Sequence, residues 1–72
     1  MMHFSNYYPS CWLAKDTRSG AIYDIYPQRL DSDDLIVTVT SDGVTMVIGY
    51  AKTRDDAISI CEDREMRILH RR

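Results

Sequence analysis

Residues 35–50, LIVTVTSDGVTMVIGY, decide the fold of this chain. Asp42-Gly43 separates two runs that are rich in β-branched residues. This dipeptide suits a type I′ turn, because both central residues of that turn need a positive φ. The stretch is therefore predicted to form a β-hairpin with Asp42 and Gly43 at its tip.

Counting outward from the turn predicts the register of this hairpin. One face receives the pairs Ser41–Val44, Val39–Met46, Val37–Ile48 and Leu35–Tyr50. The other face receives Thr40–Thr45, Thr38–Val47 and Ile36–Gly49. The first face is apolar and the second is half polar, so turn chemistry and side-chain alternation agree.

Two shorter strands are predicted before the hairpin, at residues 11–15 and 21–26, with the turn-rich residues 16–20 between them. Asp24 sets the facing of the second strand. Ile22 and Tyr26 share its side, which leaves Ala21, Tyr23 and Ile25 for the core. Residues 1–10 are predicted to be an extended arm, because Pro9 lacks a backbone donor and does not suit a central strand.

A helix is predicted to begin at Thr53, a good N-cap that is followed by two acidic residues. Ala57, Cys61 and Ile68 form its apolar stripe. Glu65 falls inside this stripe, so two alternatives stand. Either the helix continues to residue 70, or it ends near residue 64 and residues 66–68 form a short edge strand. Because no Gly or Pro marks the junction, the continuous helix is favoured.

The predicted fold class is α+β, a single small domain in which about four antiparallel strands form two hairpins in meander order. The C-terminal helix is expected to cover the face built by Val37, Val39, Met46 and Ile48. The other face, with Thr38, Thr40, Thr45 and Val47, is left for water or a partner. A chain of 72 residues is near the lower limit for independent folding, so a homodimer or a bound partner would help to complete it.

Composition narrows the function classes. The net charge of −2 gives no general affinity for phosphate backbones. No apolar run approaches the length of a membrane span, and the start of the chain lacks the pattern of a secretory leader. A cytoplasmic protein is expected. Cys11 and Cys61 have no metal-ligand spacing and are expected as buried, reduced thiols, with a disulfide between them as the alternative.

The residues that catalysis needs are not gathered in this sequence. His3 and His70 lie near the two ends of the chain, and isolated glycines make no phosphate-binding loop. The acidic residues at 31, 33 and 34 lack the spacing of a calcium loop. The sequence therefore predicts no enzymatic activity, no cofactor and no metal site.

Protein binding is the function that the residues favour, because Tyr, Trp and Arg dominate binding hot spots and this chain has five tyrosines and one tryptophan. The predicted docking surface is the free sheet face with the arm and the acidic loop: Tyr7, Tyr8, Tyr26, Asp31, Asp33 and Asp34. The alternative is a nucleic-acid-binding regulator that uses Arg64, Arg67, Arg71 and Arg72, although the helix start at Asp55-Asp56 would repel phosphate.

The layout as a whole resembles the small accessory proteins of phages and mobile elements, among them anti-CRISPR and other anti-defence inhibitors. The resemblance lies in chain length, two hairpins plus one helix, and the missing catalytic set, and it rests on no motif. It implies a protein that occludes a site on a larger host enzyme or nucleoprotein in the host cytoplasm. No functional residue is carried over from it.

Overall fold

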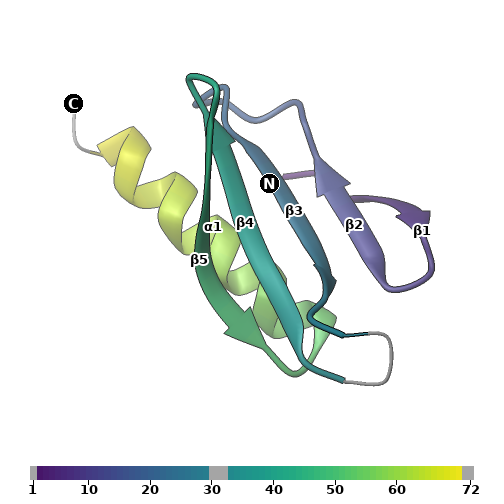
Figure 1. Ribbon diagram of the computed structural model, residues 1–72. Helices are drawn as coiled ribbons and strands as arrows, with labels where there is room; N and C mark the ends of the chain where they lie inside the picture. Colours follow the sequence, from purple (N-terminus) through teal and green to yellow (C-terminus); the bar gives the residue numbers. More distant parts are fainter. Residues whose placement is uncertain (1, 30–32, 71–72) are drawn as a thin grey trace.

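The computed structural model describes residues 2–29 and 33–70 and shows an antiparallel sheet with one helix (Figure 1). The elements are β1 (Ser5–Tyr8), β2 (Cys11–Ala14), β3 (Ile22–Pro27), β4 (Leu35–Ser41), β5 (Val44–Ala51) and α1 (Arg54–His70). The strands lie in the order β1-β2-β3-β4-β5, and α1 packs against β3, β4 and β5. The α+β class and the meander order are confirmed, with five strands rather than about four.

The additional strand comes from the segment that was predicted to be an arm. Pro9 does not interrupt a ladder there, because it lies in the tight turn between β1 and β2. The next residue, Ser10, has a φ of 60°, a conformation that suits the third position of a turn with proline at its second. The Asn6 side-chain amide donates to the carbonyl oxygens of Tyr8 and Cys11, both at 2.9 Å, and closes this hairpin.

The central hairpin has the predicted tip, with positive φ at Asp42 (54°) and Gly43 (80°). Its register is confirmed from the turn to the Thr38–Val47 pair and is wrong beyond it. A bulge shifts the pairing by one residue, giving Val37–Gly49, Ile36–Tyr50 and Leu35–Ala51. Ile48 still packs against the core, and Tyr50 moves to the opposite face of the sheet.

The bulge lies beside a close contact with the helix. An added Cβ at Gly49 would lie 3.0 Å from Cδ1 of Ile60, so a larger residue here would crowd the Ile60 side chain on the β5 backbone. Val37 pairs with this glycine and not with Ile48, the partner that simple alternation predicts. A glycine inside a strand often marks such a close approach.

Replacing Gly43 by valine should lower the free energy of unfolding by about 1–2 kcal/mol, because a β-branched residue is strained at positive φ. No atom lies within 4 Å of an added Cβ, so the cost comes from the backbone alone. Gly43→Asn is the matched control, since asparagine tolerates this conformation better than valine. Urea denaturation of the three proteins measures the difference, and equal stability of the valine and asparagine variants would contradict the turn assignment.

The core lies between the sheet and α1. Its buried apolar residues are Ala14, Ala21, Tyr23, Ile25, Leu35, Val37, Val39, Ala57 and Cys61. The predicted facing of β3 is therefore confirmed. Met46 was predicted to be covered by the helix but is 53% exposed, because β5 is an edge strand and gives it a neighbouring strand on one side only.

The helix begins and ends as the favoured alternative predicted. The Asp56 N–H donates to Oγ1 of Thr53 at 3.1 Å, which confirms the N-cap. The helix runs without a break to His70, so the alternative of an edge strand at residues 66–68 is wrong. Both cysteines are free thiols, but only Cys61 is buried as predicted, and Cys11 is half-buried. Desolvation, with a smaller effect of Glu62, raises the pKa of the Cys61 thiol to about 12.

Candidate binding surface

One face of the sheet is left uncovered by α1. Because residues paired across strands share a face, the register places three rows of side chains on it. These rows hold Leu13, Asp24, Thr38 and Val47; then Tyr26, Ile36 and Tyr50; then Ile22, Thr40 and Thr45. Together with Tyr7, which reaches Asp24, these residues form what we call the open face.

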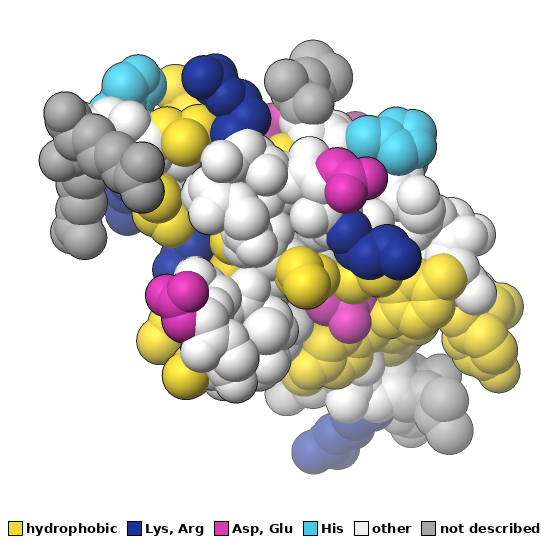
Figure 2. All heavy atoms as spheres, turned by 90° about the horizontal axis from the view of Figure 1, so that it is seen from above, with side chains coloured by type: hydrophobic (Ala, Val, Ile, Leu, Met, Phe, Trp, Pro, Cys, Tyr) yellow, Lys and Arg dark blue, Asp and Glu magenta, His cyan; other side chains and the backbone are white. Residues whose placement is uncertain are grey.

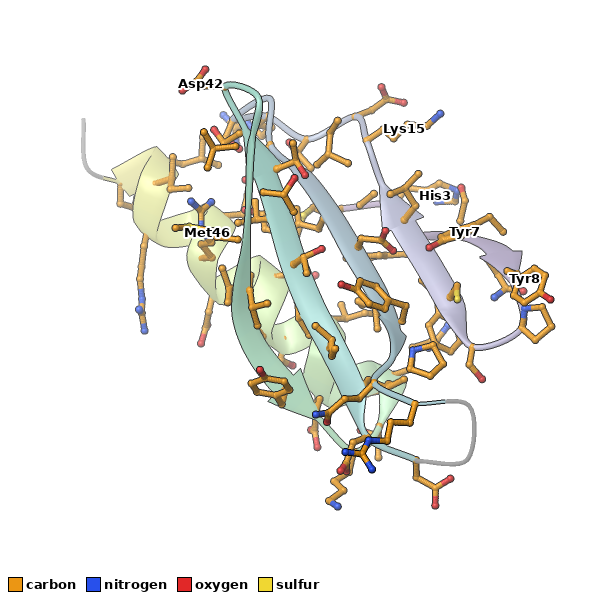
Figure 3. The ribbon with its side chains drawn as sticks, viewed as in Figure 1. His3, Tyr7, Tyr8, Lys15, Asp42 and Met46 are labelled. Atoms are coloured by element: carbon orange, nitrogen blue, oxygen red, sulfur yellow. The ribbon has the colours of Figure 1, made fainter. Side chains whose placement is uncertain are left out.

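Asp24 is the one charged side chain among these rows, and its carboxylate accepts a hydrogen bond. Tyr7 donates a hydrogen bond from its hydroxyl to Oδ1 of Asp24 at 2.8 Å. Desolvation, followed by the hydrogen bond and the charge of Asp24, raises the pKa of Tyr7 far above its ordinary value. The phenol therefore stays protonated at neutral pH and remains a donor. This bond holds the tyrosine of β1 across β2 against β3 (Figure 3).

The rest of the open face is largely apolar. Tyr7, Val47 and Tyr50 are 53%, 51% and 61% exposed, whereas Tyr26 and Ile36 are half-buried. Thr38, which was predicted to be free for water or a partner, is buried between its neighbours on this face. Figure 2, viewed from the hairpin end, shows hydrophobic side chains grouped at the lower right with an acidic group among them. A surface of this kind, with a single charged side chain and several aromatic residues, is typical of the centre of a protein interface.

The predicted acidic loop is only partly available to a partner. Asp31 lies outside the described residues. Asp33 is exposed, but Asp34 is half-buried, and its carboxylate Oδ1 lies 2.7 Å from Nζ of Lys52. The hydrogen bond and charge of Asp34 raise the pKa of Lys52. A shallow hollow of about 390 Å³ joins this ion pair to Tyr50, so the loop borders the open face.

The tyrosines named from the sequence occupy different places. Tyr7 and Tyr26 both belong to the open face, while Tyr8 is 68% exposed beside the β1–β2 turn (Figure 3). The sequence prediction missed Tyr50, because regular alternation placed it under the helix. Gly49 was the available signal, since a glycine within a strand often marks a bulge, and a bulge reverses the facing of the residues after it.

Two arginines of the nucleic-acid alternative, Arg64 and Arg67, lie in the helix layer, on the other side of the sheet. Arg64 is half-buried and donates to the hydroxyl of Tyr23 at 3.4 Å, and Arg67 is exposed. Arg71 and Arg72 lie outside the described residues. The described arginines of this group and the open-face tyrosines therefore do not share one surface.

A buried carboxylate, Glu65, was not recognised as functional or structural from the sequence. It is 6% exposed and accepts hydrogen bonds from the Ser19 N–H (3.0 Å), the Ser19 hydroxyl and the Tyr23 hydroxyl (3.0 Å). Desolvation alone would raise its pKa, but the bonds from Ser19 and Tyr23 outweigh it and lower the pKa. Glu65 thus ties the turn between β2 and β3 to α1, which explains an acidic residue in an apolar stripe.

A groove of about 380 Å³ runs beside this tether, between α1 and the turn, and is lined by Met2, Asp16, Thr17, Arg18, Glu62, Glu65, Met66 and Leu69. No three His, Cys, Asp or Glu residues gather to hold a metal ion anywhere in residues 2–29 and 33–70. Within the same described ranges, no helix is long and apolar enough to span a membrane.

Comparisons with protein-family models, with curated proteins and with solved structures find no match to this chain.

Proposed function

We propose that this protein is a non-enzymatic binding protein that docks through its open face onto a larger protein or nucleoprotein. The observation that carries the proposal is a sheet with helix cover on one side only and with exposed aromatic residues on the other. Water solvates this face poorly, because the carboxylate of Asp24, its one charged group, is already hydrogen-bonded to Tyr7. A second protein surface that covers it would bury Tyr26, Val47 and Tyr50 together.

The rigidity of the open face supports this role. The open face is formed by strands rather than loops. The hydrogen bond from Tyr7 to Asp24 fixes the Tyr7 ring, which comes from the edge strand β1. A preformed surface loses little conformational entropy when a partner docks, so more of the contact energy is retained as affinity. The specific form that we propose is an inhibitor of a host defence complex, in keeping with the layout resemblance, which acts by occupying a functional surface.

Nucleic-acid binding is less well supported by the geometry. Stacking of bases on aromatic residues works together with a basic groove that follows the backbone. Here the open-face tyrosines and the described arginines Arg64 and Arg67 lie on opposite sides of the sheet. Titration of labelled DNA and RNA at two salt concentrations tests this alternative, because binding through phosphate contacts falls steeply as salt rises.

Replacing Tyr50 by alanine should weaken partner binding by about 1–3 kcal/mol while leaving the thermal midpoint nearly unchanged, because an exposed ring is lost. The matched control is Met66→Ala, which removes a side chain of similar exposure (56%) from α1. The partner is first recovered from host lysate on the immobilised wild-type protein and identified. Its affinity for the purified wild type and both variants is then measured by calorimetry.

The inhibitor form is tested in cells that carry an active defence system and in matched cells whose system is inactivated. Expression of the wild type should raise phage plaque counts only in the first strain, and Tyr50→Ala should reduce that effect more than Met66→Ala. A partner whose affinity falls with Met66→Ala but not with Tyr50→Ala would move the docking surface to the helix and contradict the open-face proposal.

A further inference from the structure

The two edges of the sheet differ in how they are protected. β1 is four residues long, carries a bulge after Asn6 and ends at a proline turn, and these features discourage strand pairing. β5 is eight residues long and contains no charged residue and no proline. Its own bulge falls at Ile48, which has no partner between the Thr38–Val47 and Val37–Gly49 pairs, so the regular part of this edge runs from Val44 to Val47.

This first half of β5 is also unusually apolar for an edge. Val44, Met46 and Val47 are 62%, 53% and 51% exposed. Figure 3 shows Met46 at the outer side of β5, away from the other strands. An edge strand presents alternate backbone N–H and C=O groups outward, and counting from the turn-closing pair places these groups at Thr45 and Val47. An occupant must therefore supply an extended backbone as well as apolar side chains.

A second copy of β5 meets both requirements. In an antiparallel pair centred on Met46, Val44 lies opposite the copy's Ile48, and Thr45 lies opposite the copy's Val47. Met46 lies opposite Met46 of the second copy. Every pair then joins side chains on the same face: Val44, Met46 and Ile48 on the helix side, and Thr45 and Val47 on the open side.

Charge also favours this register. The nearest charged residues that flank the segment are Asp42 and Lys52. In the register centred on Met46, Asp42 falls opposite the copy's Tyr50, so no like charges meet along the paired strands. The arrangement has a two-fold axis and closes on itself, which limits assembly to a dimer rather than a fibre.

We infer that β5 is a homodimerisation edge, at which residues 45–47, centred on Met46, pair with the same residues of a second copy to make a continuous ten-stranded sheet. The inference goes beyond the proposed function and does not depend on it, because it concerns the edge and not the open face. Pairing would join two open faces side by side and double the surface offered to a partner.

The test uses the full chain and measures mass against concentration by sedimentation equilibrium. The wild type should change from monomer to dimer as concentration rises. Met46→Lys should raise the dimer dissociation constant by at least about tenfold, because two like charges meet at the two-fold axis. Met46→Glu should do the same, and an equimolar mixture of the lysine and glutamate variants should recover a heterodimer.

Met66→Lys is the matched control, since it places the same charge on an equally exposed methionine of α1 and should leave dimerisation unchanged. Circular dichroism checks that each variant is folded. Hydrogen exchange on the wild type needs no variant: the amides of Thr45 and Val47 should become protected as concentration rises. A wild type that stays monomeric at its highest soluble concentration would overturn the inference. So would a dimer that Met46→Lys leaves intact, or a variant mixture that fails to pair.

Discussion

Replacing Glu65 by alanine should lower the free energy of unfolding by about 2–4 kcal/mol, because three donors lose their shared acceptor at a buried site. These donors are the N–H and hydroxyl of Ser19 and the hydroxyl of Tyr23. The Tyr23 side chain is fully buried, so its hydroxyl has little access to water as a replacement. Chemical denaturation followed by circular dichroism measures the loss.

The matched control is Glu62→Ala, which removes a carboxylate from the same helix and the same groove outside this hydrogen-bond network. It should change stability by less than about 0.5 kcal/mol. Glu65→Gln keeps the size and one acceptor oxygen and should fall between the two alanine variants. Equal costs for Glu65→Ala and Glu62→Ala would show that the network does not hold the turn to the helix.

The pH dependence of stability gives a second measure of the same contact. Because the pKa of Glu65 is lower in the folded protein, the ionised form is favoured by folding. Its contribution should be fully present above the ordinary glutamate pKa of 4.5 and should be lost as the pH falls through the lower, folded-state value. The stability difference between the wild type and Glu65→Gln should therefore shrink on acidification and stay constant from pH 6 to pH 7.

The turns and the helix start could be predicted because each depends on local chemistry. Asp42-Gly43 supplies two residues that accept positive φ, and Thr53 supplies a capping oxygen, so neighbours in the sequence determine both features. The segment before residue 10 was misjudged for a local reason as well. Proline is unsuited to a ladder position but well suited to a turn, and Pro9 occupies the turn between two strands.

The later part of the β5 register could not be obtained from alternation, because a bulge at Ile48 interrupts it. Beside the bulge, Gly49 and Ile60 are brought together only when α1 folds over the sheet. The bulge also changes the site, because it places Tyr50 on the open face, next to Tyr26 and Ile36, and not in the predicted core. Tyr7 and Tyr26 were placed in the site by their sequence context, whereas Tyr50 required the tertiary structure.

Glu65 is a second case in which a contact between distant residues could not be predicted from the sequence. Its position in the apolar stripe of α1 was visible in the sequence and weakened the prediction of a continuous helix. The structure shows that the helix continues because Ser19 and Tyr23, more than forty residues earlier, satisfy the carboxylate. A charged residue at a core position thus indicated a specific tertiary bond rather than the end of the element.

Replacing Gly49 by valine should lower the free energy of unfolding by about 3 kcal/mol, because the new side chain overpacks the interface between β5 and α1. An added Cβ would lie 3.0 Å from Cδ1 and 3.3 Å from Cγ2 of Ile60. Whether stability falls or rises distinguishes crowding at Gly49 from simple strand propensity. A glycine at an uncrowded strand position would gain stability on replacement by valine, since valine has the higher strand propensity.

A double-mutant cycle with Ile60→Ala separates overpacking from any effect of the backbone. Truncating Ile60 opens space above Gly49, so Gly49→Val should cost much less in the Ile60→Ala background than in the wild type, with a coupling of about 1–2 kcal/mol. Urea denaturation of the four proteins gives each term. If Gly49→Val costs the same in both backgrounds, crowding against Ile60 is not the reason for glycine at this position.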